Sequence, residues 1–127
     1  MKEIAQALFN RLSVAMSPVP IFDFVKQDHK SYPYIQINQL SPLVDDSDTE
    51  NGFNTTVRIV AFSDYRGFAK VYDLADGIYT ALHLWEMPQT TSYLIGQIVE
   101  TGRQYLIAPD GLVRYSVQEF RLHIEKI

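Results

Sequence analysis

The chain has 127 residues, 46% of them hydrophobic, and a formal net charge of −4. This length and hydrophobic content fit one domain with a packed core and are short for two domains. The lack of cysteine excludes disulfides, thiolate nucleophiles and cysteine-bound zinc, and an acidic chain without a Lys/Arg cluster disfavours nucleic-acid binding, which depends on neutralising phosphates.

The N-terminal segment predicts an amphipathic helix over about residues 2–16. Ile4, Leu8 and Leu12 recur there at helical spacing, and the two prolines within residues 17–20 end the pattern. Charged residues inside this segment argue against a signal peptide, and no apolar run in the chain is long enough to span a bilayer. We therefore expect no membrane association and folding in the cytoplasm.

Three segments of the next part of the chain are predicted to be strands. Residues 21–25 form a short apolar run, and apolar and polar residues alternate over 34–40, which is typical of a half-buried strand. Residues 53–62 are rich in β-branched side chains. Since Asn51-Gly52 is a strong hairpin signal, the last two strands should pair antiparallel.

A second helix is predicted over about residues 64–83. Its apolar stripe consists of Phe68, Val71, Tyr72, Ala75, Ile78, Tyr79 and Leu82. Ser63 or Asp64 can cap its N-terminus. Gly77 lowers the helix propensity, so we interpret it as permitting a close approach of this helix to the sheet. Residues 84–91 form a connector.

The C-terminal third predicts a long β-hairpin. Its arms cover about residues 93–107, with a kink at Gly102, and residues 112–124, and they join at a Pro-Asp-Gly turn. The second arm is apolar on both faces, with Leu112, Phe120, Leu122 and Ile124 on one face and Val113, Tyr115 and Val117 on the other. The element order indicates one α+β domain over residues 1–127, with an N-terminal helix, a mostly antiparallel sheet and a central helix packed on it.

This hairpin contains more strand than a small domain usually needs, because typical strands have about 5–6 residues. Uncovered apolar faces and unpaired edges are typical of a self-association surface, which makes Val113, Tyr115 and Val117 candidate oligomer contacts. The alternative is that the two helices and the first strand cover both faces within one subunit. The pattern alone favours neither interpretation.

An acidic run of Asp45, Asp46, Asp48 and Glu50 precedes the Asn-Gly turn. Its spacing departs from that of an EF-hand, because the glycine comes one position late and Val57 stands where the bidentate glutamate belongs. A solvated loop is the simplest interpretation. A weak divalent-ion site or a partner contact stays open.

The sequence offers no recognisable catalytic, cofactor or metal site. His29, His83 and His123 have no partner at metal-binding spacing, and there is neither a nucleophile elbow nor a phosphate-binding glycine loop. We interpret His83 as a favourable cation near a helix C-terminus and His123 as a strand residue. The expectation is a protein without enzymatic activity or cofactor.

Several local strings, in this order and spacing, resemble a family of phage tail-completion proteins, also called tail terminators or tail-to-head joining proteins. The strings are Tyr-Pro-Tyr-Ile at 32–35, Val-Arg-Ile-Val-Ala-Phe-Ser at 57–63 leading into the second helix, Asp-Gly at 110–111 and Tyr-Ser-Val-Gln-Glu-Phe-Arg-Leu at 115–122. The resemblance implies a non-enzymatic virion protein that forms a hexameric ring on the tail tube, ends tail polymerisation and joins the tail to the head.

The implied partners are further copies of the chain, the tail tube protein and the connector proteins of the neck. DNA passes through such a ring without specific binding, so the acidic run at residues 45–50 could face the lumen or a charged partner. The protein would belong to the virion and be present in the host cytoplasm during assembly. Two alternatives are a head-side neck adaptor or stopper, and a cytoplasmic α+β domain that binds or transforms a small ligand.

Overall fold

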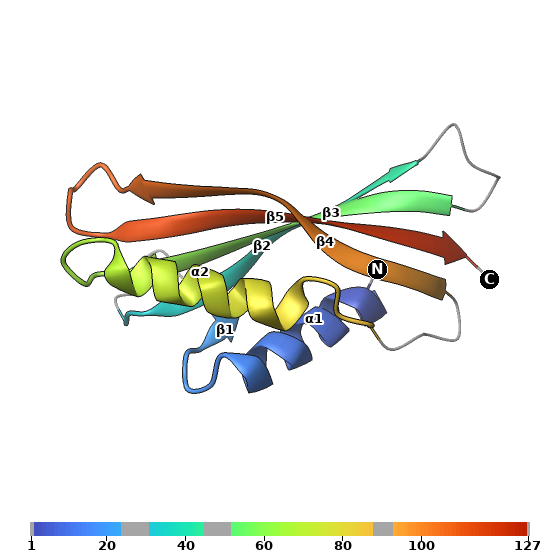
Figure 1. Ribbon diagram of the computed structural model, residues 1–127, viewed down its shortest axis with the longest axis horizontal. Coiled ribbons are helices and arrows are strands. Elements are labelled where there is room, and N and C mark those ends of the chain that lie inside the picture. The colour runs from blue at the N-terminus through green and yellow to red at the C-terminus, as the bar shows by residue number, and fades with distance from the viewer. Residues whose placement is uncertain (1, 24–30, 45–51, 88–92, 127) are drawn as a thin grey trace.

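The computed structural model describes residues 2–23, 31–44, 52–87 and 93–126. Two helices, α1 (Lys2–Ala15) and α2 (Ala69–Leu82), lie on the same face of a five-stranded sheet (Figure 1). The strands are β1 (Ile21–Phe22), β2 (Tyr34–Val44), β3 (Gly52–Ser63), β4 (Tyr93–Ile107) and β5 (Arg114–Lys126). The predicted α+β class, with a central helix on the sheet and a C-terminal hairpin, is confirmed.

The strand order is β1-β2-β3-β5-β4. β1 pairs parallel with β2, and all other pairs are antiparallel, as predicted for β2 with β3 and for β4 with β5. β2 continues past the predicted end at residue 40 although it contains Pro42. A proline lacks the N–H of a strand residue and is tolerated on an edge, and β1 pairs only with Ile35 and Gln36 of β2.

The sheet is strongly twisted. In Figure 1, β4 lies above β5 on the left and below it on the right. The pairing register shifts once in β2, between Ile37 and Gln39, and twice in β4, including a shift between Glu100 and Gly102. Such bulges increase the local twist. One of the shifts lies at Gly102, the position for which a kink was predicted.

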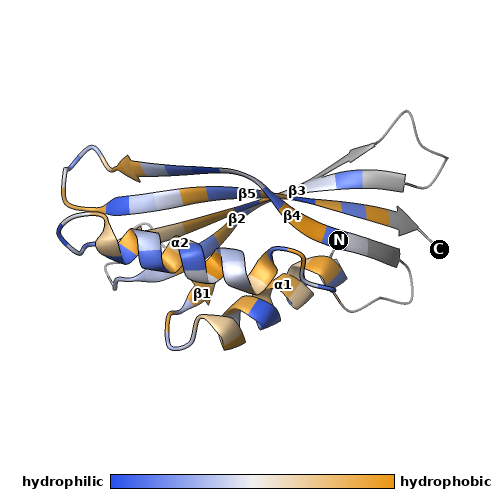
Figure 2. Cartoon of the chain, viewed as in Figure 1, coloured by the Kyte–Doolittle hydropathy of each residue, from blue (hydrophilic) through white to orange (hydrophobic). Residues whose placement is uncertain are grey.

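The core lies between the helices and the sheet. α1 contributes Ile4, Leu8 and Leu12, which are fully buried at the spacing that predicted the helix. The other members include Ile35, Val57, Ile59, Ala61, Leu74, Ile78, Leu82, Ile98, Phe120, Leu122 and Ile124. Each large apolar side chain buried in this way stabilises the fold by about 1.5–3 kcal/mol relative to exposure. Figure 2 shows the matching alternation of hydrophobic and hydrophilic residues around both helices.

The predicted start of α2 is wrong by about one turn. The helix begins at Ala69, its N-cap residue is Phe68, and no side chain caps it. The Ser63 hydroxyl instead accepts a hydrogen bond from the Tyr65 N–H at 3.0 Å. Gly67 follows with φ at +89°, a left-handed conformation that bends the chain. Ser63 and Asp64 therefore lie before the bend, where they cannot cap the helix.

Two further predictions about single residues are wrong. A Cβ on Gly77 would lie 2.8 Å from the Met16 Sδ, so the close approach at this glycine involves the chain just after α1 rather than the sheet. Leu112 is 69% exposed and precedes β5. The Asp110 carboxylate accepts a hydrogen bond from the Leu112 N–H at 2.9 Å, which extends the turn and keeps Leu112 out of the strand.

Some predictions fall partly outside the described residues, namely residues 24–25 of the first strand, His29 and residues 88–91 of the connector. Trp85 in the described part of the connector packs against the core, and the Arg11 guanidinium lies 5.2 Å from the centre of its ring. Within the described ranges, neither helix has the length and apolar character that crossing a membrane requires.

Candidate interaction surface

The sheet has a second face, which neither described helix covers (Figure 1). Alternation along β3 directs Val57, Ile59 and Ala61 towards the helices. Arg58 and Phe62 therefore project from the opposite side, which we call the helix-free face. The same alternation in β5 places Phe120 in the core and its sequence neighbours on the helix-free face.

An aromatic row crosses one end of the helix-free face. Tyr34 of β2 is the register partner of Phe62 of β3, which in turn pairs with Tyr115 of β5. The ring centres are 4.7 Å apart for Tyr34 and Phe62 and 5.6 Å apart for Phe62 and Tyr115, with near-parallel planes. Phe22 of β1 packs edge-on against Tyr34 at 5.9 Å, and Leu106 of β4 pairs with Tyr115. The row thus includes one residue from each strand.

The next rows change from apolar to charged. Val60 and Val117 are register partners beside the aromatic row. One register step further, Arg58 Nη2 and Glu119 Oε1 are 2.8 Å apart, and the side chains are 38% and 39% exposed. Arg121 follows on the same side of β5 and is exposed. The face therefore has an aromatic end, an aliphatic middle and a charged end.

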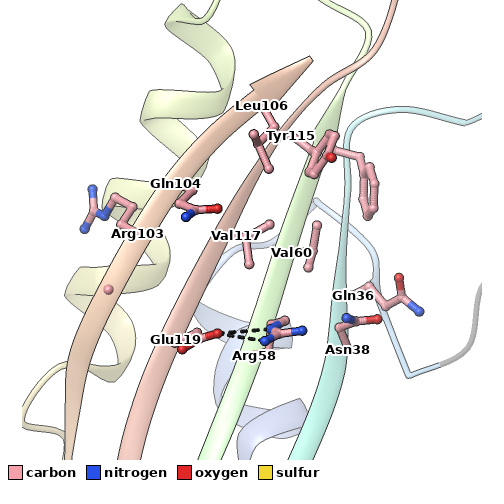
Figure 3. A pocket seen from close by; sticks show the side chains of 12 residues that line it. Gln36, Asn38, Arg58, Val60, Arg103, Gln104, Leu106, Tyr115, Val117 and Glu119 are labelled. Atoms are coloured by element: carbon pink, nitrogen blue, oxygen red, sulfur yellow. Dashed lines mark hydrogen bonds and ion pairs between the residues drawn. The ribbon is translucent and has the colours of Figure 1, made fainter. Parts of the chain in front are cut away.

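These rows enclose a hollow of about 700 Å³ (Figure 3). Its floor is formed by Val60 and Val117, and the Arg58–Glu119 pair lies at one side. Gln104 and Leu106 of β4 line the opposite side of the floor from Gln36 and Asn38 of β2. An apolar floor with a polar rim is the usual composition of a protein interface.

Figure 2 shows that β4 changes from hydrophilic to hydrophobic where it approaches the turn to β5. At this end of the strand, Leu106 is 37% exposed and Ile107 is 48% exposed. Leu106 extends the apolar part of the helix-free face beside Tyr115, whereas Ile107 pairs with Arg114 and projects from the helix side of the sheet.

A second polar group of residues lies on the helix side of the sheet. The Arg103 guanidinium donates to the Glu100 carboxylate at 3.0 and 3.2 Å and to the Asp76 carboxylate of α2 at 2.8 Å. The Gln118 amide donates to the Ala75 carbonyl and to Glu100, at 3.0 and 2.9 Å. The hydrogen bonds from Arg103 to Glu100 are the main cause that raises the pKa of Arg103. This cluster joins α2 to β4 and β5.

The carboxylates of the described sheet do not form a pair suited to acid–base chemistry. Glu100 belongs to the helix-side cluster, whereas Glu119 binds Arg58 on the helix-free face. His83 Nδ1 accepts a hydrogen bond from the Glu100 N–H at 3.2 Å. Within residues 2–23, 31–44, 52–87 and 93–126, no group of three acidic or histidine side chains could hold a metal ion.

The structure places two of the three predicted contact residues on the helix-free face. Tyr115 and Val117 belong to it and are half-buried. Val113 lies at the base of the turn, where its carbonyl accepts a hydrogen bond from the Ala108 N–H at 2.8 Å. Asp45, Asp46, Asp48 and Glu50 lie outside the described residues.

Tyr34, Val60 and Phe62 belong to this surface but were not predicted from the sequence. The alternation along β3, with Arg58, Val60 and Phe62 between core residues, contains the signal. The four consecutive apolar residues at 59–62 conceal it, because such a run is also typical of a strand buried on both faces.

Comparison with known proteins identifies a family and a fold. A family model described as "Tail completion protein gp17" matches residues 2–125 of the chain. No curated protein is similar enough to match. One matching solved chain belongs to a structure described as "Virion of native gene transfer agent (GTA) particle". It is 16% identical in sequence with a TM-score of 0.79, and the match covers 94% of this chain and 92% of that chain, which shows a shared fold.

Proposed function

Since this chain belongs to the tail completion protein gp17 family, we propose that it forms a hexameric ring that caps the tail tube and ends tail polymerisation. The family consists of structural, non-enzymatic proteins, so the protein is a structural component of a phage-like tail. Membership confirms the resemblance noted in the sequence. It also removes the support for a cytoplasmic ligand-binding or catalytic domain.

The observation that supports ring formation is the helix-free face. Its aromatic and aliphatic rows are apolar and, among the described residues, no helix covers them. Tyr34 and Val60 are already buried within the subunit, at 7% and 5% exposure, whereas Phe62, Tyr115 and Val117 are half-buried. A second protein surface over these three side chains would remove their remaining apolar area from water at about 25 cal/mol per Å². Val113, Tyr115 and Val117 are the contacts that we propose for a neighbouring copy, with Val60 and Phe62 beside them.

We further propose that the ring binds the tail tube protein on one side and neck proteins on the other, in a virion assembled in the host cytoplasm. The solved chain of the same fold belongs to a virion particle, which supports a place in the assembled particle. A head-side neck adaptor of the same fold would bind the portal or connector rather than the tube. Binding to purified tubes and to purified connectors separates these two roles.

Capping can be measured directly. Purified protein added to elongating tail tube protein should give shorter tubes with a ring at one end in negative-stain images. Val117→Asp should abolish rings and capping, because it places a charge in the middle of the helix-free face. Val14→Asp is the matched control, since Val14 is 80% exposed on α1.

Circular dichroism of both variants establishes that they are folded. Unchanged tube lengths with folded wild-type protein would contradict the capping role. Normal capping by a folded Val117→Asp variant would exclude the helix-free face as the subunit contact.

The acidic run at residues 45–50 is proposed to face the lumen or a charged partner ring. Its carboxylates would repel DNA phosphates that pass through the ring, and the net charge of −4 acts in the same direction. Replacing Asp45, Asp46 and Asp48 by asparagine and Glu50 by glutamine should change assembly or tail length. Unaltered assembly and tail length in this variant would refute the role.

A further inference from the structure

The sheet has a helical layer on one face only. The described helices cover the face that carries Ile59 and Phe120, whereas the helix-free face carries the half-buried Val117 and, more deeply buried, Val60 (Figures 1 and 3). An apolar sheet face is stable when a second layer covers it, and a helix is the common covering element. The helix-free face is hollowed, so it can receive a convex element such as a helix.

The outer surface of α2 is convex and carries side chains suited to an interface. Its exposed residues are Ala69, Tyr72, Asp73, Asp76, Tyr79 and Thr80. Tyr72 is 46% exposed and packs edge-on against Tyr105 at 4.6 Å. Tyr79 is 38% exposed and stacks on His83 at 4.5 Å. Because neighbours already hold these rings, their burial would cost little further side-chain entropy.

The two surfaces also have complementary charges. The described helix-free face carries Arg58 and Arg121 against a single acid, Glu119. The exposed residues of α2 include Asp73 and Asp76 and no basic group, and Lys70 in the first turn is half-buried. Two helix-free faces placed against each other would bring arginines together. Arg58 already binds Glu119 and Asp76 already binds Arg103 within the subunit. The charge gained when a helix-free face is placed on α2 is therefore mainly that of Arg121 near Asp73.

We propose that, in the ring, the outer surface of α2 from one copy covers the helix-free face of the next copy. The inference rests on the proposed ring and names the two surfaces that form its subunit contact. The contact is heterologous, because it joins two different surfaces, and repetition of a heterologous contact closes a ring or continues as a filament. Each subunit would contribute one helical layer and receive another.

Engineered cysteines test this contact, since the chain has none of its own. Gln104→Cys places a thiol in the hollow, and Thr80→Cys places one on the outer surface of α2; both positions are exposed. A short bis-maleimide should join the two variants when they are mixed and should leave each variant alone mainly uncrosslinked. A chain with both substitutions should give a ladder of products ending at the ring size.

The experiment is run on free protein and on protein bound to tail tubes. Efficient crosslinking of Gln104→Cys to itself would show a face-to-face contact and would overturn the inference. Rings without mixed crosslinks would overturn it as well, while leaving the ring function intact. Protein that forms no ring under either condition would overturn both the inference and the ring.

Charge reversal provides an independent test with a matched control. Asp73→Lys should weaken self-association at least tenfold, measured by sedimentation, because it opposes Arg121 of the neighbour. Asp64→Lys makes the same change in charge at an exposed position before α2 and should have little effect. If both variants weakened self-association equally, the cause would be the change in net charge rather than a contact at Asp73, which would contradict the inference.

Discussion

At the scale of single residues, the two arginine–carboxylate pairs of the sheet differ in burial. The Arg103 and Glu100 side chains are 21% and 14% exposed, and Arg58 and Glu119 are 38% and 39% exposed. Arg103→Met would leave the carboxylate of Glu100 without its main partner. We expect a loss of about 2 kcal/mol in unfolding free energy from urea titrations, against less than about 1 kcal/mol for Arg58→Met. A larger loss for Arg58→Met than for Arg103→Met would show that burial does not determine how much each pair contributes to stability.

The pH dependence of stability should report on Tyr34. Burial and then the neighbouring Tyr32 raise the pKa of Tyr34 above its ordinary value of 10.0. Below that value the phenol is neutral in the folded and unfolded states, and above it the unfolded state ionises first. Stability should therefore fall as the pH rises through about 10, and less steeply in Tyr34→Phe. Identical slopes in urea titrations of both proteins would contradict this assignment.

At the scale of elements, Gly77 couples α2 to the end of α1. Alanine is favoured over glycine in a helix by about 1 kcal/mol, but its Cβ would lie 2.8 Å from the Met16 Sδ. Gly77→Ala should therefore change the unfolding free energy by less than about 0.5 kcal/mol in the wild type and raise it by about 1 kcal/mol in a Met16→Ala background. A double-mutant cycle measures this coupling. Equal effects in both backgrounds would show that the contact between the new Cβ and Met16 does not lower the stability.

The sequence predicted α1 and the two hairpins correctly because a single local pattern determines each of them. Helical spacing identified the buried face of α1, and the Asn-Gly and Asp-Gly dipeptides in the sequence predicted the antiparallel pairing in both hairpins. The start of α2 was not predictable in the same way, because Ser63 and Asp64 are good capping residues in any helix. Only the left-handed conformation of Gly67 shows that the chain bends between them and the helix.

At the scale of the whole molecule, the sequence predicted part of the candidate surface. Tyr115 and Val117 were recognised because they alternate with core residues along one strand. Tyr34 and Phe62 join them only through the register of β2, β3 and β5, which brings together residues that are distant in sequence. A single strand cannot reveal which of its two faces the helices will cover.

Salt should act on the proposed assembly as a whole. If arginines of one copy meet aspartates of the next, raising NaCl from roughly 0.05 to 0.5 M shortens the screening length and should weaken self-association several-fold. Asp73→Lys should show a smaller salt dependence, because the attractive pairs are already lost. Association that strengthens with salt in the wild type would indicate a purely apolar contact.

The irregular edges of the sheet affect how readily copies of the protein can associate through their outer strands. β4 carries two register shifts, and β2 is interrupted by a bulge and a proline next to the short β1. Bulges, proline and short outer strands hinder the edge-to-edge pairing of two sheets through backbone hydrogen bonds. For a component of a phage-like tail, this hinders the growth of uncontrolled fibres through its own sheet edges.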